Sequence, residues 1–249
     1  MRRVVFITVL CAFIAVPTMA DMVKPTGTDP DGGLQGYGPW QAGSGGEFSL
    51  LPSGWSYNPL LYYADSTKNQ GTTGTFQSFC IEYLQPEYLY AETWHASVLN
   101  DHAIMGSNPL SGDPLSVGAA YLYYKFATGN LTGYNYSNTG VGREASALEL
   151  QNALWWLEGE IDLYPTTNIF AKAVVDLFGA AAIADNNGQY NVAIMNLWVP
   201  DHIGDFSKDA NGNYLYLRQD QLVLVPVPAA VLLGLLGLGV AGIKLRKYT

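Results

Sequence analysis

Cysteine and histidine are scarce in this chain of 249 residues. Cysteine occurs only at Cys11 and Cys80, and histidine occurs only three times. A structural zinc site needs four such ligands at close spacing, so we expect no metal site. The sequence also lacks a glycine-rich phosphate loop, so nothing in it indicates a nucleotide or another cofactor.

Positive charge is scarce as well. Five of the 12 Lys and Arg residues lie at the two ends of the chain, at positions 2, 3, 244, 246 and 247. Residues 21–225 therefore hold 7 basic residues against all 21 acidic ones, a net charge of −14. Such a surface repels polyanions, and we expect no nucleic-acid partner.

The first 20 residues have the layout of a secretory signal peptide. Arg2 and Arg3 give a short positive start, an almost wholly apolar run covers residues 4–16, and small residues precede a cleavage position after Ala20. The run is too short to span a bilayer comfortably. We predict a signal peptide over residues 1–20, with an uncleaved anchor as the alternative.

The last 24 residues have the pattern of a C-terminal sorting signal. Residues 225–228 read Val-Pro-Val-Pro, residues 229–243 carry no charge, and a basic tip follows. This arrangement resembles the PEP-CTERM sorting signal, although the best-known form has Glu in place of Val227. The resemblance implies an exosortase-type processing enzyme as partner and membrane anchoring, transient or lasting, by residues 229–243. It places the protein at the cell surface, outer membrane or extracellular matrix of a Gram-negative-type bacterium; an ordinary tail anchor at 226–249 is the alternative.

Residues 21–225, between the predicted signal peptide and the sorting tail, are numerous enough for one domain with a core. Cys80 is its only cysteine, so an internal disulfide has no partner. In an exported protein the thiol is then free, intermolecular or otherwise modified. A buried and inert thiol is the simplest alternative.

Hydrophobic periodicity predicts strands on both sides of a helical part. We expect an irregular segment at 21–46 and strands within 48–63 and at 72–84, 88–98, 191–199 and 214–225. We expect helices at 116–127, 143–159 and 168–182, the last burying Ile169, Ala173, Val174, Leu177 and Phe178. The fold class is therefore α+β, a domain of strands with an inserted helical part, followed by a C-terminal apolar helix.

Two short motifs are candidates for a reactive site. The first is Phe-Cys-Ile around Cys80, on a predicted strand, and the second is Leu-Gln-Asn-Ala-Leu-Trp from 150 to 155, on a predicted helix. In this order and on these elements they resemble the two halves of the thioester domain of surface adhesins. The resemblance implies a thioester-domain fold and a bond between the Cys80 sulfur and the Gln151 side-chain carbonyl. Side-chain alternation then requires both side chains to meet in one interface.

A thioester couples a protein covalently to its partner. An amine or hydroxyl attacks the activated acyl group and becomes linked to Gln151 while the thiolate leaves. Trp155 would shield such a bond from water, and Glu82, two residues from Cys80, could accept or relay a proton. We expect adhesion to an unknown surface or matrix ligand rather than enzyme activity.

Two other functions compete with this interpretation. The first is a non-reactive structural protein of the extracellular matrix, in which Cys80 is inert. The second is a Cys–His hydrolase, in which His95, His102 or His202 activates Cys80. None of these histidines lies in a hydrolase motif, and a mid-strand cysteine lacks the helix N-terminus that lowers a thiol pKa.

The signal peptide prediction is tested at the N-terminus of the exported protein. Cleavage after Ala20 leaves Asp21 as the first residue, because the apolar run and the small residues end there. Edman sequencing or terminal peptide mass spectrometry of the exported protein should therefore begin at Asp21. A chain that begins at Met1 would make the segment an anchor.

Overall fold

The computed structural model describes residues 21–25, 38–42, 45–53, 75–83, 94–104, 112–137, 142–162 and 165–224. The predicted signal peptide, the tail and its apolar helix lie outside these ranges. The strands are β1 (Asp21–Pro25), β2 (Gln41–Ala42), β3 (Gly45–Gly46), β4 (Phe48–Ser53), β5 (Phe76–Ser78), β6 (Trp94–Asn100), β7 (His102–Ala103), β8 (Asp113–Pro114), β9 (Val192–Trp198) and β10 (Leu217–Leu224). The helices are α2 (Val117–Ala127), α3 (Arg143–Leu157) and α4 (Ile169–Phe178), with 3₁₀ turns at Pro165–Thr167 and Gly179–Ile183. Within the described ranges, none of the helices combines the length and the apolar character needed to cross a bilayer.

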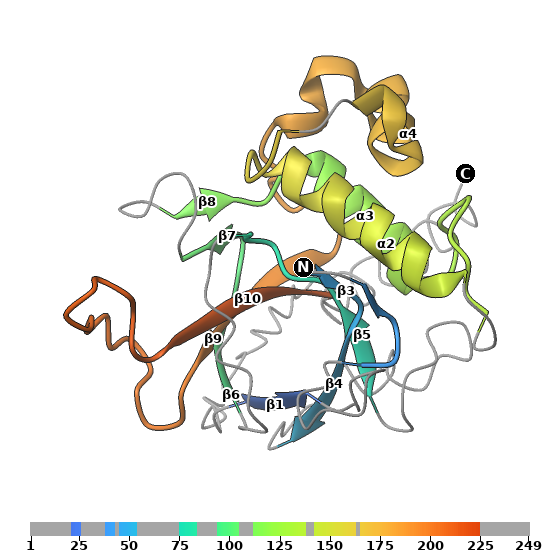
Figure 1. The fold of residues 1–249 in the computed structure, drawn as a ribbon. Helices are drawn as coiled ribbons and strands as arrows, with labels where there is room; N and C mark the ends of the chain where they lie inside the picture. Colours follow the sequence, from blue (N-terminus) through green and yellow to red (C-terminus); the bar gives the residue numbers. More distant parts are fainter. Residues whose placement is uncertain are drawn as a thin grey trace, which may run out of the picture.

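Six strands form one antiparallel sheet in the order β10-β9-β6-β1-β4-β5. Its two outer strands meet, because the residues after β5 pair with β10 at the antiparallel bridge between Cys80 and Gln221. The sheet therefore curls into a ring, which Figure 1 shows end-on. Closing the ring pairs strand edges that would otherwise be open to other chains.

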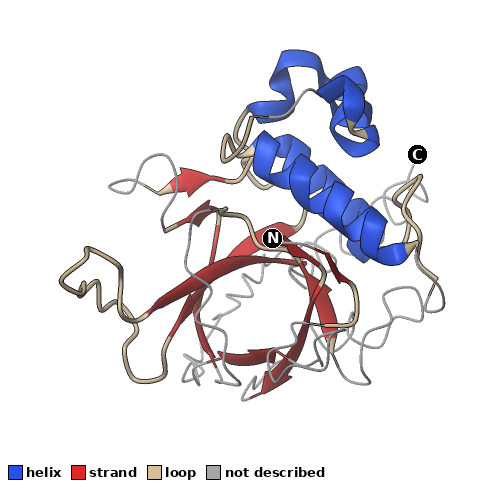
Figure 2. Cartoon of the chain, viewed as in Figure 1, coloured by secondary structure: helices blue, strands red, loops and turns tan. Residues whose placement is uncertain are grey.

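The helices lie together on one side of this ring (Figure 2). In chain order they fall between β8 and β9, so the helical part is inserted between early and late strands. This confirms the α+β class and the inserted helical part expected from the sequence.

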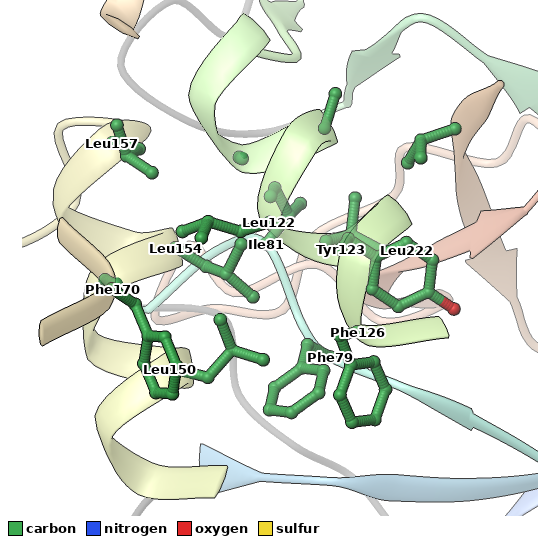
Figure 3. Close-up of a cluster of buried hydrophobic side chains, with 14 of the residues drawn as sticks. Phe79, Ile81, Leu122, Tyr123, Phe126, Leu150, Leu154, Leu157, Phe170 and Leu222 are labelled. Atoms are coloured by element: carbon green, nitrogen blue, oxygen red, sulfur yellow. The ribbon is translucent and has the colours of Figure 1, made fainter. Parts of the chain in front are cut away.

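The strands have two faces, and each face packs into a different core. Successive side chains of a strand point to opposite faces. The interior core lies inside the ring and consists of Val23, Phe48, Leu50, Phe76, Cys80, Trp155, Ala193, Met195, Leu197 and Val223. The helix core lies between the ring and the helices and includes Phe79, Ile81, Leu122, Tyr123, Phe126, Leu150, Leu154, Phe170, Ile194 and Leu222 (Figure 3).

The predicted starts of α2 and α3 agree with the structure. Ser116 caps α2, and its hydroxyl accepts a hydrogen bond from the Ala119 N–H at 3.1 Å. α3 begins at Arg143 as predicted, and Gly159, two residues past its end, has a left-handed φ of 75° that favours glycine. Both helices bury a stripe of side chains at helical spacing in the helix core.

Sequence-based expectations for segment 21–46 and for the third helix are wrong. The segment 21–46 is not wholly irregular, because Asp21–Pro25 forms β1 at the centre of the sheet, where β4 and β6 on either side supply its hydrogen-bond partners. The third helix ends at Gly179, which adopts a φ of 58°, and only a 3₁₀ turn follows. Its expected buried face is also rotated: Val174 is buried as expected, but Ile169 and Leu177 are 51% and 57% exposed. Phe170 and Ala171 are buried in their place.

Glu158 joins the end of α3 to the start of α2. Its Oε1 accepts hydrogen bonds from the Ser116 hydroxyl at 2.7 Å and from the Ser116 N–H at 3.2 Å. Burial raises the pKa of Glu158 from 4.5 to about 8, against the lowering effect of these bonds. The folded protein therefore keeps a proton that the unfolded chain releases in this range, so stability falls as pH rises from 4.5 to about 8.

Replacing Glu158 by Gln should remove this pH dependence. Glutamine keeps the accepting oxygen but has no proton to lose, so the variant gains stability relative to the wild type by up to about 1.4 kcal/mol per pH unit across that range. Urea unfolding of residues 21–225 at a series of pH values measures the difference. Parallel curves for the two proteins would show that Glu158 titrates normally.

Candidate functional site

Cys80 lies where the chain changes its strand neighbour. β5 pairs with β4 as far as Ser78, opposite Phe48, and the next residues pair with β10 instead. The regular strand is therefore shorter than the expected 72–84, and Cys80 occupies a single bridge beyond it. Its side chain is completely buried and its thiol is free of any disulfide.

Helix α3 brings Gln151 to the same point. Leu150 and Leu154 of this helix pack in the helix core, while Trp155, one turn after Gln151, packs in the interior core with Cys80. Residues four apart lie on the same helix face, so Gln151 points the same way as Trp155. Its side chain is completely buried.

The Cys80 and Gln151 side chains are in direct contact. The Cys80 thiol donates to Gln151 Oε1 at 3.3 Å, and Gln151 Nε2 donates to the Cys80 carbonyl oxygen at 2.7 Å. The second bond fixes which end of the carboxamide faces the sulfur. The two residues singled out in the sequence, 71 positions apart, therefore present a thiol to an amide carbonyl.

Gly45 and Trp155 lie against Gln151, and Tyr83 packs on Trp155. Gly45 of β3 lies so close that a Cβ there would fall 2.6 Å from Gln151 Cγ and 2.8 Å from the Trp155 ring. Trp155 is 2% exposed, and the Tyr83 ring packs edge-to-face against it with a centroid distance of 4.9 Å. A side chain at position 45 would have to push the Gln151 and Trp155 side chains aside, so this close approach favours glycine.

Glu82, the candidate proton relay, lies two residues beyond Cys80. Its side chain is buried, and its backbone carbonyl accepts a hydrogen bond from Gln219 Nε2 at 2.7 Å. Gln219 belongs to β10, so the segment after Cys80 stays attached to that strand.

The structure describes side-chain partners for two of the three candidate histidines of a Cys–His site. His102 pairs with the exposed Asp101 at 2.8 Å, and the His202 ring stacks on Tyr216 with a centroid distance of 3.7 Å. His95 lies on β6, and its side chain is outside the described part of the structure. No group of three or more His, Cys, Asp or Glu side chains with metal-binding geometry occurs among the described residues.

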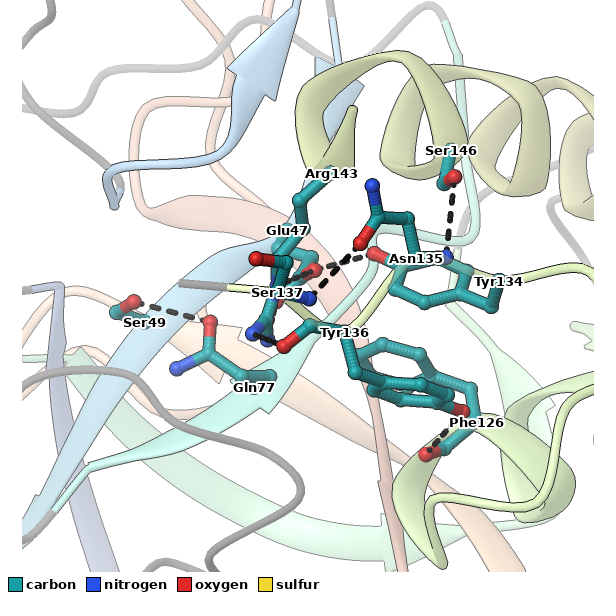
Figure 4. Close-up of polar contacts among 10 residues, drawn as sticks. All are labelled: Glu47, Ser49, Gln77, Phe126, Tyr134, Asn135, Tyr136, Ser137, Arg143 and Ser146. Carbon is teal, nitrogen blue, oxygen red and sulfur yellow. Dashed lines mark hydrogen bonds and ion pairs between the residues drawn. The ribbon is translucent and has the colours of Figure 1, made fainter. Parts of the chain in front are cut away.

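A buried ion pair at the start of α3 was not expected from the sequence. Arg143 donates to both carboxylate oxygens of Glu47, at 2.7 and 2.8 Å, and both side chains are completely buried (Figure 4). Tyr134 also donates to Glu47, and the Arg143 guanidinium lies 3.6 Å from the centre of the Trp40 ring. Burial raises the pKa of Glu47 although Arg143 lowers it.

One sequence signal points to this pair. A positive side chain at a helix N-terminus opposes the helix dipole, so Arg143 as the first residue of α3 needs a compensating partner. Glu47 is that partner, and it lies directly after β3, the strand that covers Gln151. The ion pair therefore holds α3 and the covering strand together.

Comparisons with protein-family models, with curated proteins and with solved structures found no match to this chain. The site is therefore interpreted from its own geometry.

Replacing Arg143 by Met should destabilise the domain strongly. The change keeps most of the side-chain volume but leaves the Glu47 carboxylate buried without its cation, which costs about 3–5 kcal/mol. Chemical unfolding of residues 21–225 measures the loss. As a control, Lys172→Met removes an exposed ion pair with Asp176 and should cost about 1 kcal/mol or less. Equal losses in the two variants would contradict a structural role for the buried pair.

Proposed function

We propose that this chain is an exported protein of the bacterial surface or extracellular matrix that binds its partner covalently through a thioester between Cys80 and Gln151. The observation that carries the proposal is the reciprocal contact of these two buried side chains. A thiol held against a carboxamide carbonyl reacts far more readily than the same groups free in solution, because their orientation is already fixed.

The bond forms by exchange of the amide nitrogen for sulfur. The Cys80 sulfur attacks the Gln151 side-chain carbonyl carbon, the thiol proton passes to the amide nitrogen, and ammonia leaves. An amine or hydroxyl of the partner later attacks the same carbon and releases the Cys80 thiol. Each molecule reacts once and stays attached to its partner, so the protein acts as an adhesin and not as an enzyme.

The surroundings of the pair suit a thioester. Both side chains are inaccessible to solvent, and Trp155 and Gly45 lie over Gln151. Excluding water protects an activated acyl group from hydrolysis until a partner reaches it. Glu82, buried close by in the chain, remains a candidate for moving the proton.

The predicted signal peptide and the sorting tail complete the proposal. A signal peptide over residues 1–20 would export the chain, and the PEP-CTERM-like tail at 226–249 would direct it to an exosortase and hold it at the membrane through residues 229–243. The domain between them, 21–225, would then be presented as a thioester-type domain to a surface or matrix ligand.

A non-reactive structural matrix protein is the second candidate. One observation favours it: in the structure the Gln151 carboxamide already accepts from the Cys80 thiol and donates to the Cys80 backbone carbonyl. Such a pair is stable without further reaction.

Intact mass spectrometry separates the two functions. If the thioester forms, mature protein is lighter by one ammonia than its sequence, and its thiol reacts with a maleimide only after methylamine treatment. Cys80→Ala and Gln151→Ala should each abolish the mass difference and methylamine incorporation, whereas the exposed Gln189→Ala should change neither. A full sequence mass in the wild type, with a thiol that becomes reactive only on unfolding, would establish the structural function instead.

A further inference from the structure

The carboxamide of Gln221 is completely buried. The residue has no solvent exposure, and neither Nε2 nor Oε1 has a hydrogen-bond partner among the described residues. Buried polar groups in native proteins are rarely left unpaired, because each loses its hydrogen bonds to water without replacement. A residue that keeps such a group therefore needs an explanation.

Strand register directs this side chain into the ring. Gln221 of β10 lies directly between Met195 of β9 and Cys80, opposite each of them. Residues opposite one another in a sheet point to the same face, and both Met195 and Cys80 belong to the interior core. Further along β10, Leu222 belongs to the helix core and Val223 to the interior core. Because side chains alternate along a strand, Gln221 lies on the same face as Val223, toward the interior core.

The pairing with Cys80 is of the closely spaced type. The flanking residues make the backbone bonds: the Ile81 N–H donates to the Asp220 oxygen at 3.1 Å, and the Leu222 N–H donates to the Phe79 oxygen at 3.0 Å. The bridge residues themselves exchange none of these bonds, which defines a non-hydrogen-bonded pair with Cα atoms about 4.5 Å apart and side chains closest to each other. The Gln221 and Cys80 side chains therefore leave the two strands next to each other and on the same face.

Thioester chemistry creates a need for a hydrogen-bond donor at this place. When the Cys80 sulfur attacks, the Gln151 carbonyl oxygen becomes an oxyanion. In the unreacted state that oxygen accepts from the Cys80 thiol itself. The thiol gives up its proton in the reaction, so this donor is lost as the negative charge develops. In an apolar interior an unstabilised oxyanion is costly.

We propose that Gln221 Nε2 supplies the missing donor and stabilises the oxyanion on Gln151 Oε1, both when the thioester forms and when an amine opens it. This inference rests on the proposed function. Gln221 itself gains and loses no atoms: the thiol proton leaves with ammonia, and on opening the amine proton passes to the departing Cys80 sulfur. This donor role explains why a polar side chain is retained on the interior face of β10.

The test compares the wild type with Gln221→Met, which is close in size and has no donor. Methylamine opens the thioester and adds its own mass to the protein, so intact mass spectrometry measures the rate of opening. This rate should be about 100-fold lower in the variant than in the wild type. The fraction of purified protein that is lighter by one ammonia should also fall. Thermal stability should be unchanged or higher, because unpaired polar atoms are removed. Should the Met variant fail to fold, Gln221→Val, whose side chain suits a strand, takes its place.

A second glutamine on β10 supplies the matched control. Gln219 is also buried, and its Nε2 donates to the Glu82 carbonyl. Gln219→Met should lower thermal stability but leave the rate of methylamine opening as in the wild type.

The outcomes separate this inference from the proposed function. A wild type lighter by one ammonia, together with a Gln221→Met protein that opens at the wild-type rate, would overturn the role of Gln221 and leave the thioester intact. A wild type at its full sequence mass would overturn both. We expect the folded Gln221→Met protein to open slowly and the Gln219→Met protein to open at the wild-type rate.

Discussion

The pairing of residues 79–81 with β10 is the contact on which the rest of the structure depends. It closes the six-stranded sheet into a ring, because β5 and β10 are the two outer strands. It also assigns side chains to faces: Phe79 and Ile81 enter the helix core, while Cys80 enters the interior core. Residues 79–81 therefore contribute to both the closed sheet and the candidate site. Cys80 keeps its position only while the ring is closed.

The position of Gln151 depends on how α3 is held at its two ends. Arg143 ties the first residue to Glu47, and Glu158, just past the last residue, accepts from Ser116. Gln151 lies eight residues after Arg143, about 12 Å along the helix axis. A buried ion pair contributes little net stability compared with apolar packing, but it permits only one geometry. We infer that its effect here is to fix the axial position of the helix, so that the carboxamide stays at the sulfur.

The sequence was informative where structure is set locally. The helical spacing of apolar residues predicts helices that start at 116 and 143, and the structure has α2 beginning at Val117, just after its Ser116 cap, and α3 at Arg143. β1 was missed because its strand conformation depends on pairing with β4 and β6 and not on its own composition. Glu47 and Arg143 are 96 positions apart, and Gln221 meets Cys80 only through ring closure. Such contacts have no signal in local periodicity, so the partner of Arg143 and the buried Gln221 carboxamide emerge only in three dimensions.

Gln151 shows how structure decides between a boundary residue and a site residue. A glutamine at the edge of an apolar stripe is usually half-exposed, with its amide in water. Here the side chain is completely buried, and both ends of its amide are bonded to Cys80. A helix needing only to pack against the sheet would be served equally well by Leu or Met at this position, since neither requires a buried partner. The pairing of the one cysteine of residues 21–225 with a buried carboxamide is the arrangement that the proposed thioester requires, and packing alone does not call for it.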